Sequence, residues 1–304
     1  QWGNSEVFFS GSTTLDNGLK VAAKVELEAN QGAASDSIDR SFLTISSDEM
    51  GALSMGAMPH AADDMDVRAP NAGNLDWRDT DNFAGSATAA TAATAAYTNS
   101  SNSIYQWGNN DGIKLKYASP NFSGVTVGGS WGGKSSGNET EDNRLTLTSA
   151  EDSWTVGAKY SGDFDGVGVK ASLVHGSGAV TNVEQTQVGL SVSTAGFTIG
   201  GGYSDFDDTR DNPTASNDGE GWELGVGYET GPYSVSAAYM TSSNKDTTAT
   251  AGDNEDTKWN VVATYDMGAG VALSATYFKS EADQEGTTAA VDVNGLIAGI
   301  EVGF

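Results

Sequence analysis

A serine flanked by glycines is the strongest sign of catalytic chemistry in the sequence. Ser130 stands in the stretch GGSWG at 128–132, which has the spacing of the nucleophile elbow of α/β-hydrolases. That elbow needs a strand that turns directly into a helix, whereas the pattern around Ser130 predicts a strand that continues. The general base would have to be His60 or His175, and the spacing gives no sign that either approaches the serine. We therefore expect no enzymatic activity and interpret the glycines as steric relief inside a strand.

Metal and phosphate chemistry is weakly indicated. The chain has two histidines and no cysteine, so a zinc site is not expected, and the glycines at 200–202 precede no helix that could bind phosphate. Acidic residues gather at 205–220 and 246–256, and carboxylate oxygens suit calcium or magnesium, but neither cluster has the spacing of an EF-hand. We expect no required cofactor; Ca²⁺ or Mg²⁺ at the acidic loops is the one candidate, with plain solvated acidity as the alternative. The formal net charge of −26 argues against a nucleic-acid partner.

Charged residues of opposite sign fall in two different contexts. The long stretch 59–110 lacks strand periodicity and is acidic in its first half, with Asp63, Asp64, Asp66, Asp76, Asp79 and Asp81. Basic residues instead alternate with apolar ones in strand-like segments, and the main ones are Lys20, Lys24, Arg40, Lys114, Lys116 and Lys159. The alternatives that involve no function are a disordered surface loop for the acidic stretch and a solvated sheet face for the basic residues.

The elements that would position these residues are β-strands. Apolar and polar residues alternate with period two in about fifteen segments, which predicts an all-β fold. The predicted strands lie near 4–14, 19–29, 37–46, 51–58, 111–119, 123–132, 152–162, 165–175, 183–194, 196–204, 221–230, 232–241, 257–266, 270–279 and 293–304. Short and long connections alternate strictly between them, which is typical of a transmembrane antiparallel barrel with tight turns on one rim and longer loops on the other.

Several features favour a membrane environment for this barrel. No apolar run reaches the roughly 18 residues of a spanning helix, and the mean hydropathy of −0.35 suits strands of which only alternate residues face lipid. Pairs of aromatic residues six positions apart, such as Trp222 and Tyr228, predict belts at the membrane interfaces. The last predicted strand ends on Phe304, as such barrels commonly do. Because closed bacterial barrels have even strand numbers, we expect a sixteenth strand before Gln1.

The sequence resembles the general diffusion porins of Gram-negative bacteria, the sixteen-stranded trimeric type, and within it the α-proteobacterial porins. The resemblance rests on the stretch SGSTTLDNGL at 10–19, the stretch YASPNFSG at 117–124 and the Phe304 terminus. It implies one barrel domain over 1–304, with short periplasmic turns and longer extracellular loops. It also implies that 59–110 folds inward and constricts the pore, with the six aspartates facing the six basic residues across a narrow eyelet.

The function implied is passive diffusion of small hydrophilic solutes and ions through a water-filled channel in the outer membrane. The implied partners are two further copies in a homotrimer, outer-membrane lipid and lipopolysaccharide, and the permeating solutes. The alternative is a soluble acidic extracellular β-protein, such as an adhesin or a surface-layer module. The sequence does not specify the permeant solute, the size cutoff or the ion selectivity.

Overall fold

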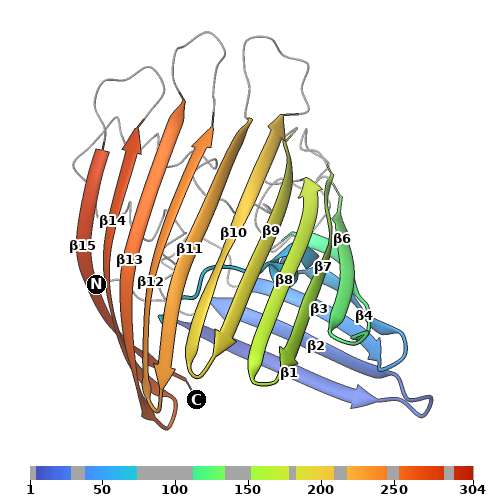
Figure 1. Ribbon diagram of the computed structural model, residues 1–304. Coiled ribbons are helices and arrows are strands. Elements are labelled where there is room, and N and C mark those ends of the chain that lie inside the picture. Colours follow the sequence, from blue (N-terminus) through green and yellow to red (C-terminus); the bar gives the residue numbers. More distant parts are fainter. Residues whose placement is uncertain are drawn as a thin grey trace. The chain divides into compact units, whose positions relative to one another are not determined.

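The computed structural model describes residues 5–28, 38–73, 112–133, 152–177, 183–208, 218–244, 253–283 and 291–303, which are almost entirely strands (Figure 1). The fifteen strands are β1 Glu6–Thr14, β2 Lys20–Glu28, β3 Ile38–Ser47, β4 Gly51–Ala57, β5 Ile113–Ala118, β6 Val125–Gly132, β7 Ser153–Phe164, β8 Val167–Ser177, β9 Val183–Thr194, β10 Phe197–Asp208, β11 Gly219–Thr230, β12 Tyr233–Asn244, β13 Asn254–Gly268, β14 Val271–Asp283 and β15 Val291–Val302.

The strands form one antiparallel sheet in which each strand neighbours those before and after it in the chain. The all-β, antiparallel prediction is confirmed, and each predicted strand is present within a few residues of its expected bounds. The predicted sixteenth strand stays a prediction, and Phe304 lies outside the described residues. Within the described part of the chain, no helix has the length and apolarity that a membrane crossing requires.

Two compact units make up the chain. The first comprises residues 1–66, 107–160 and 173–184, and the second comprises 67–106, 161–172 and 185–304. In the second unit, Figure 1 shows β11 to β14 running side by side with their short turns at the same end.

Residues that accept positive φ explain the tightest turns. Ala195 and Gly196 have φ of 50° and 83°, and Ala269 and Gly270 have φ of 54° and 77°. Two successive residues with positive φ are the mark of the type I′ hairpin turn, whose twist matches that of the flanking strands. The turn between β7 and β8 is of the same kind, but it lies two residues after the predicted Asp163–Phe164.

The two faces of the sheet differ as the alternation predicts. On β11, Trp222, Leu224 and Val226 are exposed, while Glu223 between them is only 3% exposed. The apolar face is therefore the bare one and the polar face is the covered one, the reverse of a water-soluble sheet. Large exposed apolar residues occur on this face of strands in both units.

Aromatic side chains on the apolar face of β10 to β14 form two rows. Near the short turns, Phe197 contacts Tyr228 and Tyr233 stacks on Tyr265, with ring centroids 4.4 and 5.0 Å apart. About six residues further along these strands, Trp222 contacts Tyr239 and Trp259 contacts Tyr277, with centroids 5.3 Å apart in both pairs. Two rows at this spacing match the aromatic girdles of membrane barrels.

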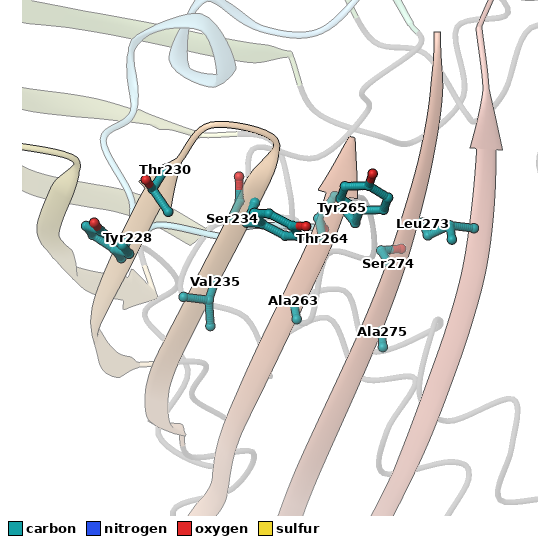
Figure 2. Close-up of a pocket in the computed structure, with 11 residues that line it drawn as sticks. Tyr228, Thr230, Ser234, Val235, Ala263, Thr264, Tyr265, Leu273, Ser274 and Ala275 are labelled. Carbon is teal, nitrogen blue, oxygen red and sulfur yellow. The ribbon is translucent and has the colours of Figure 1, made fainter. Parts of the chain in front are cut away.

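The row near the turns borders a shallow cavity of about 350 Å³ on the apolar face (Figure 2). Tyr228, Tyr265 and Leu273 line it near the short turns, and Ala263 and Ala275 line it further along β13 and β14. Tyrosines suit the membrane interface, and the small residues on the side away from the turns leave room for lipid acyl chains.

Candidate functional site

The candidate site is built by residues 58–73, which leave β4 and contact the polar face of the sheet; we call them the crossing segment. They include one short helix, α1 Ala61–Met65, that the alternation did not predict. In the first unit, α1 contacts β5 and β6. The crossing segment is largely buried: Met58 and His60 have no exposed surface, and Ala61 and Ala62 are 1% exposed.

A histidine and two hydroxyls fix the start of the crossing segment. His60 Nδ1 lies 2.8 Å from Ser130 Oγ of β6, which also accepts a 2.9 Å hydrogen bond from the backbone N–H of Ala61. Ser130 Oγ lies 2.9 Å from Thr155 Oγ1 of β7, and Thr155 accepts the N–H of Ala62 at 3.2 Å. These contacts anchor two helix-terminal N–H groups that have no partner within the helix.

The meeting of His60 and Ser130 corrects one expectation from the sequence. No histidine was expected near Ser130, yet the two side chains are hydrogen-bonded partners 70 residues apart. The elbow itself is absent, because Ser130 lies inside β6, which continues to Gly132, and not at a turn. Ser130 is also only 7% exposed and its oxygen is occupied by the segment it holds, so the pair is arranged as an anchor.

Burial keeps the His60 imidazole neutral. Desolvation, together with the smaller effects of the positive charges of Lys114 and Lys116, lowers the pKa of His60 to about 3. His60 Nε2 is buried and has no hydrogen-bond partner among the described residues. Placing a second proton on this ring would therefore bury an uncompensated charge beside two ammonium groups.

Lys114 of β5 closes the base of the long connection. Its Nζ donates to the carbonyl of Met58 at 2.9 Å and to the carbonyl of Gly112 at 3.0 Å, so one ammonium holds residues at both ends of the connection. Lys114 is 3% exposed. The sequence predicted a pore-facing charge here, whereas the structure places the charge against backbone carbonyls.

Lys116 and Lys159 meet the helix itself. Lys116 Nζ donates to Asp64 Oδ2 at 2.7 Å, and Lys159 Nζ of β7 donates to the backbone carbonyl of Asp64 at 3.3 Å. The sequence expectation set acidic and basic residues across an aqueous gap. Here Asp64 and Lys116 are in direct contact, although the Asp64 side chain remains 60% exposed.

In the second unit the remainder of the crossing segment is held in the same way. The backbone N–H groups of Val67, Ala69 and Ala72 donate to side chains of β8, β11 and β12: Ser172 Oγ at 3.0 Å, Glu223 Oε1, and Ser236 Oγ at 2.9 Å. Thr264 of β13 donates its hydroxyl to the carbonyl of Ala72. Polar side chains on four strands thus satisfy a backbone that forms no sheet or helix of its own.

Glycines on the polar face leave room for the crossing segment. In the first unit a Cβ at Gly128 would clash with Met65, and in the second a Cβ at Gly189 would clash with the carbonyl of Val67. A Cβ at Gly225 would lie 3.1 Å from the Cβ of Ala69. Glycine in the middle of a strand costs stability, so its presence on this face marks a close approach of backbone. The interpretation from sequence, steric relief inside a strand, covers only the glycines of 128–132 and does not include this close approach.

The other predicted residues lie apart from these contacts. Lys20 and Lys24 are on β2 and Arg40 is on β3, where Lys24 and Arg40 both pair with buried Glu26, at 2.5 and 3.5 Å. Asp63 lies in α1 and Asp66 follows it as the C-cap, whereas Asp76, Asp79 and Asp81 lie outside the described residues. Within the described ranges no group of three or more His, Asp or Glu could hold a metal ion.

A sheet that exposes its apolar face, carries aromatic rows on it, and covers its polar face with a crossing segment defines an outer-membrane channel protein. The Gram-negative porin family model matches residues 1–285, and the chain belongs to this family. It is an outer-membrane protein that allows diffusion through a water-filled β-barrel, so the polar face lines the lumen. The soluble alternative is thereby set aside. No curated protein matches the chain in sequence.

Solved outer-membrane proteins share the fold at low sequence identity. In vitro folded OmpT of Vibrio cholerae, described as a trimer form, is 14% identical with a TM-score of 0.67, and 99% of this chain and 91% of that one are covered. OmpF of Salmonella typhi, in complex with daunomycin, is 14% identical with a TM-score of 0.67 over 98% and 89% of the two chains. The anion-selective porin of Comamonas acidovorans is 16% identical with a TM-score of 0.55 over 98% and 88%.

Proposed function

We propose that the crossing segment is the constriction of the channel and sets which small hydrophilic solutes pass. The observation that carries this is its set of hydrogen bonds to lumen-facing side chains of β6, β7, β8, β11 and β12. A segment held on the lumen face occupies space that water and solutes would otherwise use. The rest of 59–110 belongs to the same proposed constriction loop within one barrel domain.

We further propose a homotrimer, supported by the trimer form described for OmpT of Vibrio cholerae. Outer-membrane lipid and lipopolysaccharide would surround the apolar face. The proposal includes no cofactor and no catalysis, since Ser130 and His60 serve as an anchor. Calcium or magnesium at the acidic loops stays a prediction.

The arrangement of charges supports a weak preference for cations. Lys116, Lys24 and Arg40 each have a carboxylate partner, so these three basic residues contribute little uncompensated positive charge. The formal net charge of the chain is −26. Excess negative charge raises the local concentration of cations over a screening length of about 10 Å at 0.1 M salt.

Reversal potentials across a planar bilayer with a salt gradient test this preference. We expect a potential of the sign that cation permeation gives, which shrinks as the salt concentration rises because screening weakens the fixed charges. A stable potential of anion sign at low salt would show that lumen lysines dominate, and the charge assignment would then be wrong.

A further inference from the structure

The anchor of the crossing segment contains the one buried histidine among the described residues, and it faces other charges on several sides. From β5, Lys114 and Lys116 face it; Asp63 and Asp64 come from α1; and Lys159 of β7 reaches the carbonyl of Asp64. The two lysines oppose a positive charge on the ring, while the Asp64 carboxylate is already engaged by Lys116. Within the described part of the chain, His60 Nε2 is buried and has no acceptor in reach.

We propose that His60 is a proton-sensitive positioning residue, which holds the crossing segment against β6 while its ring is neutral and releases it when the ring takes up a proton. This inference rests on the proposed function, because the segment controls permeation only if it constricts the lumen. The release of the segment itself is independent of that role and can be measured separately.

Release follows from the number of partners that the site offers. In the anchored state the neutral ring has only one N–H donor, and Ser130 Oγ, 2.8 Å from Nδ1, can accept it. A doubly protonated ring has two N–H donors and needs two acceptors, but among the described residues only Nδ1 has a partner, because the buried Nε2 has none. When the segment leaves the site, both ring N–H groups can bind water, and the N–H groups of Ala61 and Ala62 lose their hydrogen bonds to Ser130 and Thr155. The imidazolium is therefore favoured in the released state and the imidazole in the anchored state.

The direction with pH follows from the two protonation states. A solvated histidine has a pKa near 6.5, and the anchored one has a pKa of about 3. The released state therefore binds more protons between these values, and anchoring weakens as pH falls below 6.5. Between about pH 7.5 and about pH 5, the ratio of anchored to released segment should fall by up to about thirty-fold.

Hydrogen exchange of backbone amides in the purified protein in detergent tests the inference. The amides of Ala61 and Ala62 report directly, since both donate to hydroxyls of the strands. After correction for intrinsic exchange rates, their protection should fall by roughly ten- to thirty-fold between about pH 7.5 and about pH 5. His60→Asn keeps a polar atom near the Nδ1 position but cannot titrate, so protection in that variant should not change with pH.

The other histidine supplies the matched control. His175 is half-exposed on β8, where it contacts Trp154 and lies 3.8 Å from Glu184. His175→Asn should keep the full pH response of the natural protein. Equal protection of Ala61 and Ala62 at both pH values in the natural protein would overturn the inference, and this holds even if His60→Asn does not fold. If the amides lose protection at low pH as expected but the single-channel conductance is the same at both pH values, the release of the segment by His60 is supported and the proposed constriction is contradicted.

Discussion

Deletion of Asp63–Asp81 should enlarge the channel. The crossing segment contacts lumen-facing side chains and close-approach glycines, so its removal empties part of the cross-section. The conductance of a water-filled pore rises with its narrowest cross-section, and we expect an increase of roughly twofold together with entry of larger solutes. Single-channel recording in a planar bilayer and swelling of liposomes with sugars of graded size measure both effects.

A deletion of similar length elsewhere is the control. Residues 134–150, between β6 and β7, form another long connection, and their removal should leave conductance and size cutoff nearly unchanged. Equal conductance of the Asp63–Asp81 deletion and the natural protein would place the constriction elsewhere.

Lys114→Met should lower the free energy of unfolding far more than Lys116→Met. The first change leaves the carbonyls of Met58 and Gly112 without a charged donor in a buried place. A buried polar group that loses its partner costs about 1–3 kcal/mol, so we expect a loss of roughly 2–4 kcal/mol in the free energy of unfolding. Lys116→Met removes only the ion pair with the largely exposed Asp64 carboxylate, and such a pair is worth about 0–1 kcal/mol.

Urea unfolding of the two variants in lipid vesicles, followed by tryptophan fluorescence, measures this difference. The comparison is matched because both lysines lie on β5, on the same face and two residues apart. If Lys116→Met proved the more destabilising variant, the hydrogen bonds of Lys114 to Met58 and Gly112 would not be what holds the two ends of the long connection together.

The strands could be predicted because their pattern is local. Alternation on β11 and β13 records which residues face lipid and which face the lumen, and the short turns carry their own glycine signals. The apolar face is exposed along these strands, so each outward residue must be apolar whatever the rest of the chain does.

The site could not be predicted in detail because it depends on contacts between distant segments. His60 meets Ser130 across 70 residues, and nothing periodic near His60 indicates its direction. Lys114 and Lys116 are both lysines on the same face of β5, yet one binds backbone carbonyls and the other a carboxylate. The inward-facing glycines were the one usable signal, because glycine on a lumen face marks backbone that approaches closely.

Chemical modification of a cysteine on α1 tests most directly whether the crossing segment lies in the path of ions. The natural chain has no cysteine, and the Asp64 side chain is 60% exposed, so Asp64→Cys offers a single accessible thiol. Reaction with a bulky hydrophilic thiol reagent during recording should lower the conductance in discrete steps, while Asp48→Cys in the turn between β3 and β4 should react without effect. Complete modification of the cysteine at position 64, verified by mass, with no change in conductance would contradict the account.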